Sequence, residues 1–299
     1  MTETSKPGAS ALERGAPGRA AAAWGAPPAA ACPSLTSREF GLFRDWLYRS
    51  AGISLAEHKR TLVAARLLKR VQQLGAGSYG EYFHLLMNGD SADELQVALD
   101  LLTTNETYFF REPKHFDYLR EEILPRRSGD RPFRVWSAAS SSGEEAYTIA
   151  MVLAEVMGLG APWEILGSDI SSRVLAMARS ARYGLARATG IPKDYLAKYC
   201  LKGIGRQSGS LLIDRPLRER VSFRSINLNA ALPEIGTFDV VFLRNVMIYF
   251  DLDTKRKVVA RILPHLRPGG YLILSHAENL HGVTDAVEPI EPSIFRRPA

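Results

Sequence analysis

The chain has few of the residues that build covalent or metal-bound frameworks. Its 299 residues include two cysteines, Cys32 and Cys200, and six scattered histidines. Two cysteines are too few for a disulfide framework or a zinc cluster, and the histidines show no spacing typical of metal ligands. The sequence therefore predicts that the protein holds no metal ion.

Long apolar runs and targeting signals are also missing. No window approaches eighteen uninterrupted apolar residues, so no transmembrane helix and no membrane insertion are expected. The alanine-rich start lacks the charged lead and the continuous leucine or valine core of a signal peptide. These absences predict a cytoplasmic protein, and because no apolar surface stripe demands a dimer, we expect a monomer.

The pattern along the chain predicts a tail and two folded units. Residues 1–34 are rich in Ala, Gly and Pro and are predicted to be disordered. Residues 35–105 carry apolar side chains at helical spacing, which predicts helices from Thr36 or Ser37 and around 57–74, 78–88 and 91–102.

The second unit, residues 106–299 with its linker, shows a different pattern. Beyond Pro132 apolar runs alternate with amphipathic segments, which predicts a Rossmann-like α/β fold with a parallel sheet and helices on both faces. Between residues 184 and 225 this alternation gives way to Gly-rich and charged sequence with short β-prone pieces. We interpret residues 184–225 as an inserted small antiparallel β-subdomain.

The charge distribution points to an acidic partner. The net charge is +6 and the pI is near 9.3. One predicted helix is strongly basic, because residues 59–70 contain five cations and no acid. Lys59, Arg66 and Arg70 follow at seven- and four-residue steps, which places them on roughly one helix face. The alternative is an ordinary solvated face.

The turn after the first strand of the α/β unit predicts a nucleotide site of unusual composition. It reads Ser137-Ala-Ala-Ser-Ser-Ser-Gly143, with small residues but one glycine, which argues against a dinucleotide fingerprint. The next strand ends at Asp169, where such folds bind the two ribose hydroxyls of a nucleoside. Asp169 could instead only cap the helix that begins at Ser171. Glu145, in the first turn of its helix, is favoured there by the helix dipole in any case.

Five segments together carry a family resemblance. LLTTNETYFFREPKHF, WSAASSSGEEAYTIAM, LGSDIS, INLN and FLRNVMIYFD resemble, in order and spacing, the motifs of CheR-type chemotaxis receptor methyltransferases. The resemblance covers about residues 36–297. It implies methylation of glutamate side chains in the cytoplasmic part of chemoreceptors, with S-adenosylmethionine as the cofactor and S-adenosylhomocysteine as its product.

The resemblance also implies a set of cofactor-binding residues. Residues of the linker, Asn105, Thr107 and Arg111, would reach over the cofactor. Glu145 would contact its methionyl part and Asp169 its ribose. The adenine side and the floor of the cleft would be lined by Asn227 with Leu228 and by Arg244 with Asn245.

Two residues are predicted to act on the substrate. A glutamate is already ionised at neutral pH, so methyl transfer needs no general base, only a desolvated and well-oriented carboxylate. Arg111 can hold a carboxylate through paired hydrogen bonds, and the Tyr249 hydroxyl can orient it. The alternative for Tyr249, at the aromatic end of a predicted strand, is core packing.

The resemblance also places the partner. In such enzymes the helical domain faces acidic receptor helices, which would assign Lys59, Arg66, Lys69 and Arg70 to receptor binding. The glycines Gly203, Gly205 and Gly209 suit a β-turn and resemble those of family members whose subdomain adds a receptor's C-terminal peptide as an extra strand. On their own they indicate only a loop.

Other functions remain as alternatives. Enzymes that methylate amino groups of nucleic acids usually carry Asn or Asp followed by Pro-Pro and an aromatic residue, whereas this chain has Arg244-Asn-Val-Met-Ile-Tyr249 at that place. A cytosine C5 methyltransferase would need a nucleophilic cysteine in a strand-end loop, and Cys200 lies in the predicted inserted region instead. Nucleic acid is therefore not the expected substrate. A methyltransferase acting on another protein or a small molecule remains possible. So does a non-catalytic module that binds S-adenosylmethionine to signal, although Arg111 and Tyr249 together speak against it.

Overall fold

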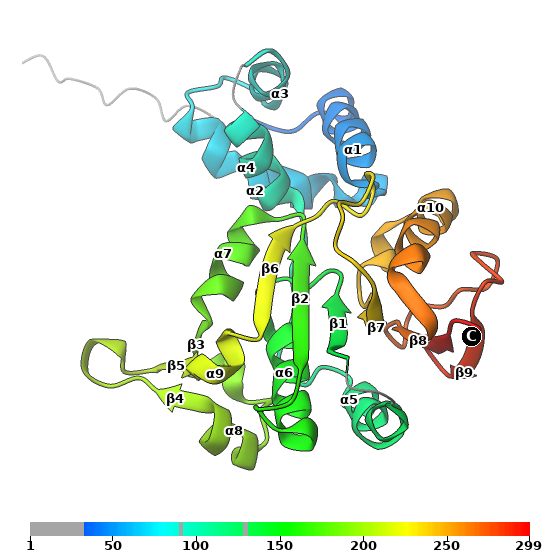
Figure 1. Cartoon of the computed structure of the whole chain (residues 1–299). Coiled ribbons are helices and arrows are strands. Elements are labelled where there is room, and N and C mark those ends of the chain that lie inside the picture. Colours follow the sequence, from blue (N-terminus) through cyan, green and yellow to red (C-terminus); the bar gives the residue numbers. More distant parts are fainter. Residues whose placement is uncertain (1–32, 90–91, 128–130) are drawn as a thin grey trace, which may run out of the picture. The chain divides into compact units, whose positions relative to one another are not determined.

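The structure is a computed structural model that describes residues 33–89, 92–127 and 131–299. The predicted disordered tail, residues 1–34, lies almost wholly outside the described residues. Contacts join Pro33–Ala299 into one unit, in which a helical domain precedes a domain built on a sheet (Figure 1). Among the described residues no helix is both long and apolar enough to cross a bilayer.

The helical domain follows its apolar periodicity. Helix α1 begins with a capping box, in which Thr36 Oγ1 accepts from the Glu39 amide at 3.2 Å and the Thr36 amide donates to the Glu39 carboxylate at 2.9 Å. Apolar side chains recurring every three or four residues form one buried core. The helices are α1 (Ser37–Ala51), η1 (Glu57–Lys59), α2 (Arg60–Gln73), α3 (Tyr79–Asn88) and α4 (Ala92–Leu102).

The main sheet has seven strands in the order β6-β2-β1-β7-β8-β10-β9. Five of them run parallel, and β10 and β9 add an antiparallel edge. The order reverses between β1 and β7, and in open α/β sheets ligands bind at such a switch point. The strands are β1 (Phe133–Ser137), β2 (Trp163–Asp169), β6 (Val221–Ser225), β7 (Phe238–Phe242), β8 (Leu266–Ile273), β9 (Glu288–Glu291) and β10 (Ile294–Arg296).

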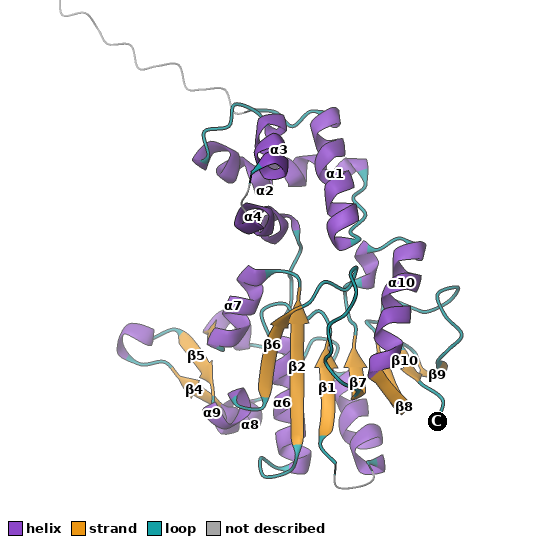
Figure 2. Ribbon diagram, turned by 45° about the horizontal axis from the view of Figure 1, so that its top comes forward, coloured by secondary structure: helices purple, strands orange, loops and turns teal. Residues whose placement is uncertain are grey.

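Alternate residues of the parallel strands enter two separate cores, as the two-residue period of a strand requires. Val135 packs with α6 on one face, whereas the next residue, Trp136, packs with α10 on the other. Figure 2 shows α6 behind the strands and α10 in front. The helices of this domain are α5 (Lys114–Tyr118), η2 (Leu119–Ile123), η3 (Leu124–Arg126), α6 (Glu144–Met157), α7 (Ser172–Ser180), η6 (Met247–Tyr249), α10 (Leu252–Ile262) and η7 (Leu263–His265).

A separate three-stranded antiparallel sheet, in the order β3-β5-β4, lies between α7 and β6 in the sequence. The small β-subdomain is therefore present, but the predicted range 184–225 is wrong at its end. Val221–Ser225 forms β6, which pairs in parallel with β2 in the main sheet. The subdomain elements are β3 (Arg182–Gly184), η4 (Leu185–Ala188), α8 (Lys193–Tyr199), β4 (Cys200–Lys202), η5 (Gly205–Gln207) and β5 (Ser210–Ile213), followed by α9 (Arg215–Arg218).

The predicted strand placement of Tyr249 is also wrong. Strand β7 ends at Phe242, and Tyr249 closes the 3-10 helix η6. The break lies at Asn245, whose φ of +56° is incompatible with an extended strand. An apolar run cannot by itself distinguish one long strand from a strand, a turn and a short helix.

Candidate active site

A cavity of about 530 Å³ opens at the carboxyl ends of β1, β2 and β7. Every residue that the sequence predicted to bind the cofactor lines it, as does the second predicted catalytic residue, Tyr249. Its volume lies within the usual range for small-molecule sites. The predicted residues that it brings together are Asn105, Thr107, Arg111, Glu145, Asp169, Asn227, Leu228, Arg244, Asn245 and Tyr249.

The serine-rich turn after β1 is held in place by Asp169. The Asp169 carboxylate accepts hydrogen bonds from the amides of Ser141 and Ser171, each at 2.9 Å, and its burial raises its pKa. It therefore ties the turn to the start of α7, in addition to any ligand role. A carboxylate offers about four acceptor positions, so acceptor capacity remains for a ribose hydroxyl.

Gly143 is required where this turn enters α6. Its φ is +95°, and a Cβ atom there would lie 2.9 Å from the Ala178 side chain. Because its N-cap residue is this glycine, helix α6 has no side-chain N-cap hydrogen bond. The one glycine of the turn thus serves the close packing of α6 on α7.

Arg244 and Glu145 form a charged floor. Arg244 Nη1 lies 3.0 Å from Glu145 Oε2, and the Ser137 hydroxyl donates to the other carboxylate oxygen at 2.6 Å. Burial raises the pKa of Glu145, while the Arg244 guanidinium and the Ser137 hydrogen bond oppose that rise. Arg244 also donates to the main-chain oxygen of Arg111. One buried arginine therefore joins the floor of the cavity to the linker above it.

The linker keeps an unusual backbone over the cavity. Phe110 and Glu112 both have a φ of +56°, a conformation that costs energy in residues with a side chain. The Asn105 carbonyl accepts from the Ser141 hydroxyl at 2.8 Å. Arg111 lies 5.5 Å from the centre of the Tyr108 ring and donates to the Glu106 carbonyl at 2.9 Å. Its guanidinium therefore retains donors for a carboxylate.

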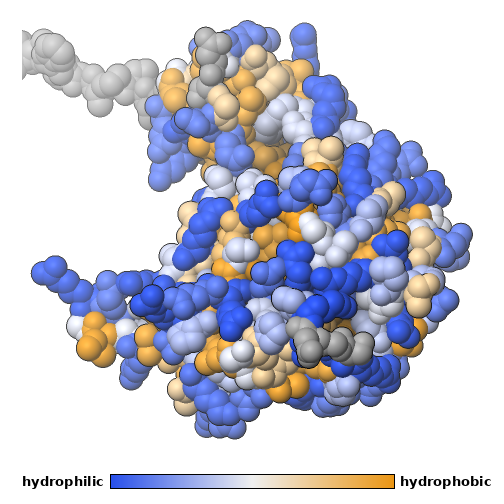
Figure 3. Space-filling view, viewed as in Figure 1, coloured by the Kyte–Doolittle hydropathy of each residue, from blue (hydrophilic) through white to orange (hydrophobic). Residues whose placement is uncertain are grey.

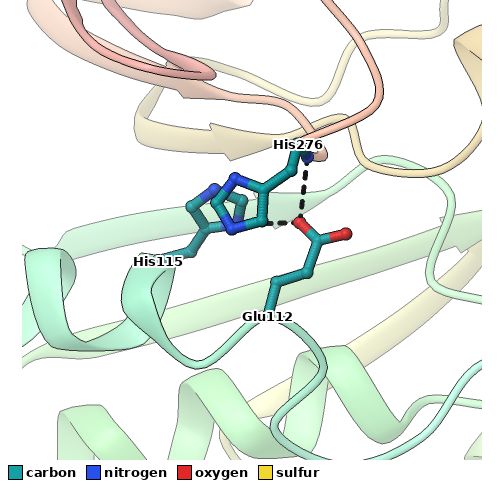
Figure 4. A group of neighbouring side chains, drawn as sticks. All are labelled: Glu112, His115 and His276. Carbon is teal, nitrogen blue, oxygen red and sulfur yellow. Dashed lines mark hydrogen bonds and ion pairs between the residues drawn. The ribbon is translucent and has the colours of Figure 1, made fainter.

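Glu112 of the linker forms a cluster with His115 and His276 (Figure 4). Their candidate metal-ligand atoms lie within 4.8 Å of one another, a grouping that positions 112, 115 and 276 could not reveal in the sequence. Arg244 Nη2 lies 3.2 Å from the Glu112 carboxylate, so a guanidinium already occupies the place where a cation would neutralise that acid. Burial lowers the pKa of His115 to about 3. We interpret the cluster as a clamp that holds the strained linker.

Both the nitrogen and the oxygen of the Asn227 side-chain amide form hydrogen bonds within the protein. Its Nδ2 donates to the Ser50 carbonyl at 2.6 Å, and its Oδ1 accepts from the Asn229 amide at 2.9 Å. Asn227 therefore stabilises a local turn in addition to lining the cavity. The side chain also joins the helical domain to the loop that carries Leu228.

The helical domain supplies a wall of the cavity that the sequence did not reveal. Ala51, the last residue of α1, and residues 53–56 line the cavity, and the Ser54 amide donates to the Tyr249 carbonyl at 2.8 Å. Gly52 permits this approach, because its φ is +73° and a Cβ there would lie 2.7 Å from the Thr254 side chain. A glycine directly after an amphipathic helix was the available signal, but it indicates only a helix end.

The position of Tyr249 is compatible with both of its predicted alternatives. Its half-buried ring packs against the core beneath α10, and the residue also lines the cavity. The neighbouring turn is fixed by Glu278, which accepts from the amides of Asn245 at 2.9 Å and Ile248 at 3.2 Å. Packing orients the ring and leaves the hydroxyl as the group that can act on a ligand.

The four basic residues predicted to bind a partner differ in their surroundings. Lys59 and Arg66 line the cavity. Arg66 donates to the Leu102 carbonyl at 2.6 Å, and Arg70 forms an ion pair with Glu94. Lys69 is exposed. Two of the four are therefore engaged in contacts within the protein, because Arg66 joins α2 to the end of α4 and Arg70 joins α2 to Glu94 of α4.

The three predicted turn glycines lie together in the connection between β4 and β5. Gly205 and Gly209 have φ of +56° and +83°, and a Cβ at Gly203 would lie 2.0 Å from the Gln207 carbonyl. Beside them Ile204 is 83% exposed, which is unusual for a large apolar side chain. None of these turn residues lines the cavity.

Comparisons with known proteins agree with this arrangement. The CheR methyltransferase all-alpha domain matches residues 38–103, and the CheR methyltransferase SAM-binding domain matches residues 105–295. The chemotaxis protein methyltransferase of Escherichia coli (strain K12) is 41% identical over 249 residues, 82% of this chain and 86% of that protein. Chemotaxis protein methyltransferase 2 of Pseudomonas aeruginosa is 40% identical over 262 residues, 87% of this chain and 93% of that protein. This chain therefore belongs to the CheR family of methyltransferases, and its cofactor is S-adenosylmethionine.

Proposed function

We propose that the protein methylates glutamate side chains in the cytoplasmic part of chemoreceptors and forms glutamate methyl esters. The observation that carries this proposal is the shared cavity of Asp169, Glu145, Arg111 and Tyr249. The first two suit a nucleoside cofactor with a cationic methionyl end, and the last two suit a carboxylate. The relatives named above as chemotaxis protein methyltransferases support the choice of chemoreceptors.

The cofactor supplies a methyl group on a sulfonium, which a carboxylate oxygen displaces in line as the carbon–sulfur bond breaks and a neutral thioether leaves. A glutamate, with a pKa of about 4.3, is already ionised at neutral pH, so no protein group has to remove a proton. The residues of the chain have to strip water from the carboxylate and fix one oxygen near attack distance.

Individual roles follow from the contacts. Asp169 offers its remaining acceptor capacity to the ribose, and Glu145 attracts the methionyl ammonium, with Arg244 opposing the rise that burial causes in its pKa. Arg111 donates to the substrate carboxylate through the guanidinium nitrogens that Glu106 does not occupy. Tyr249 orients the same carboxylate with its hydroxyl. The remaining cofactor contacts are assigned to Asn105, Thr107, Asn227, Leu228 and Asn245.

We assign receptor docking to the exposed part of α2, with Lys69 as its clearest contact and Lys59 at the mouth of the cavity. Acidic receptor helices would be attracted to these cations. We further propose that the protein acts as a cytoplasmic monomer recruited to membrane receptor arrays.

A receptor tail peptide is proposed to bind at the small sheet. Strands β3 and β4 are its outer strands, and an extended peptide can add to such an edge through main-chain hydrogen bonds. The exposed Ile204, at the turn formed with Gly203, Gly205 and Gly209, offers an apolar contact beside that edge. Titration with receptor C-terminal peptides tests this assignment, and no binding at high peptide concentration would refute it.

The proposed activity is tested with labelled cofactor and receptor-containing membranes. Alkaline treatment releases volatile methanol from a carboxyl methyl ester but not from a methylated amine. We expect alkali-released label that depends on both enzyme and receptor. Label that resists alkali would favour a methyltransferase on another group, and a protein that binds the cofactor without transfer would be the signalling module.

A further inference from the structure

A second cleft, of about 270 Å³, lies beside the methyl-transfer cavity and is rich in arginine. Arg66 comes from α2, Arg173 from α7 and Arg187 from η4, and Thr103, Asn105 and Ser142 complete its polar wall. Arg66, Thr103 and Asn105 line both cavities. An occupant of the cleft would therefore lie next to a substrate held in the active site.

Figure 3 shows the surface hollowed between the helical domain and the three-stranded sheet, with hydrophilic side chains along the edges of the hollow. Helices α2, α4 and α7 border this hollow (Figure 1). The cleft is open to a macromolecule from outside and is not a closed internal void.

The positive charge of the cleft is largely uncompensated. No carboxylate in the described ranges lies within ion-pair distance of Arg66 or Arg173, and their guanidinium groups donate to main-chain carbonyls and the Thr104 hydroxyl. Arg187 pairs with the fully buried Glu144. Burial lowers the pKa of Arg66, Tyr249 opposes this decrease, and the nearby Arg173 adds a smaller decrease. Two neighbouring guanidinium groups without an acid between them are stabilised by an anion.

The position of the cleft indicates which kind of anion would bind there. A free anion could reach it, but the shared wall with the active site favours a group that arrives with the substrate. On a helix, residues three, four or seven positions apart share one face, so an acidic helix that presents one glutamate to the cavity presents another carboxylate nearby. We propose that this cleft binds a second carboxylate of the acidic protein substrate, and that Arg173 positions the substrate through it. This proposal rests on the proposed function.

Arg173 can be changed without disturbing the active site. It is exposed, and its guanidinium donates a long hydrogen bond of 3.4 Å to the Asp100 carbonyl. Arg179 is a matched control, because it lies on the same helix, is also exposed and donates to one main-chain oxygen, that of Phe223, at 3.1 Å. Both Arg→Ala variants remove one positive charge from α7.

The test compares wild type, Arg173→Ala, Arg173→Lys and Arg179→Ala in methylation of a purified chemoreceptor cytoplasmic fragment. We expect Arg173→Ala to raise the KM for the fragment about three- to tenfold, with kcat and cofactor affinity unchanged, and Arg173→Lys to recover most of the loss. The difference from Arg179→Ala should shrink as salt rises from about 0.05 to 0.5 M.

Equal KM values for Arg173→Ala and Arg179→Ala at low salt, or an Arg173→Ala defect confined to cofactor affinity, would overturn the proposal. These results are distinct from a failure of the proposed function. In that case the wild-type enzyme would transfer no alkali-labile methyl group to the fragment at all.

Discussion

The carboxylate of Asp100, near the end of α4, accepts hydrogen bonds from the Ser172 amide at 2.9 Å and the Ser172 hydroxyl at 2.7 Å, at the start of α7. The buried acid thus caps a helix of the other domain. Gln96, one turn earlier on α4, donates to the Ile170 carbonyl at 3.0 Å. The helical domain therefore holds the segment that follows Asp169.

This contact predicts that Asp100→Asn weakens cofactor binding although Asp100 does not line the cavity. The amide would place a donor against the amides of Ser172 and Arg173 and loosen the loop after Asp169. We expect the Kd for S-adenosylmethionine to rise about three- to tenfold, since such caps contribute about 1 kcal/mol. Calorimetric titration measures it, with the exposed Asp93→Asn as the control. Equal affinities of the two variants would contradict the prediction.

Tyr249→Phe should separate binding from turnover. The ring keeps its packing against the core, and only the hydroxyl is lost. We expect kcat to fall about 10- to 100-fold with cofactor affinity nearly unchanged, because one orienting donor is removed. Arg111→Ala should slow transfer as well, and because Arg111 lines the cofactor cavity it can also weaken binding. Undiminished turnover in both variants would remove the two residues from the mechanism.

Lys69→Glu tests receptor docking more cleanly than changes at Arg66 or Arg70. Lys69 is exposed, so its reversal should leave the free energy of unfolding within about 0.5 kcal/mol of wild type. We expect the KM for receptor to rise several-fold at low salt. Arg70→Glu, by contrast, would place a second acid beside Glu94 and lower stability. Receptor kinetics of Lys69→Glu that match wild type across a salt series would identify an ordinary solvated residue.

The buried His115 predicts a pH dependence of stability. Its pKa falls from 6.5 to about 3 in the folded protein, because burial, the nearby Arg244 and His276 all disfavour the charged ring, against the attraction of Glu112. Its contribution to stability is therefore fully present above pH 6.5 and is lost as pH falls, because the unfolded chain takes up the proton first. The slope approaches about 1.4 kcal/mol per pH unit below that value.

The role of His115 is tested by how steeply the free energy of unfolding changes with pH, and not by its absolute value. Denaturant unfolding of wild type and His115→Asn between about pH 7 and pH 5 should show a shallower dependence in the variant. His281→Asn, which replaces an exposed histidine, should keep the wild-type slope. The same slope in all three proteins would show that His115 titrates normally when folded.

The sequence predicted those parts of the structure that depend on short-range pattern. The helices of the first domain follow from apolar spacing, and the cofactor residues lie in motifs whose order matches the family. Contacts between segments far apart in the chain could not be predicted from these patterns. Asp100 on Ser172, Asn227 on Ser50 and the wall at Ala51–Ala56 each depend on how the helical domain packs against the loops.

The wrong boundaries have related causes. The segment Val221–Ser225 looks like any short β-prone piece, and only its pairing with β2 assigns it to the main sheet. The break between β7 and η6 depends on Asn245 adopting a left-handed backbone, supported by Glu278 from a distant loop. The sequence of α2 looks the same whether Arg66 and Arg70 are free or have partners within the protein. Their partners lie in α4, at Leu102 and Glu94.

The chemical identity of the methylated atom tests the central claim most directly. A purified chemoreceptor cytoplasmic fragment, incubated with the enzyme and S-adenosylmethionine, is digested under mildly acidic conditions and sequenced by tandem mass spectrometry. We expect one added methyl group on glutamate side chains, absent with Tyr249→Phe at early times and removed by alkali. Methyl groups on lysine, arginine or the chain terminus, or an unmodified fragment alongside a cofactor-binding enzyme, would contradict it.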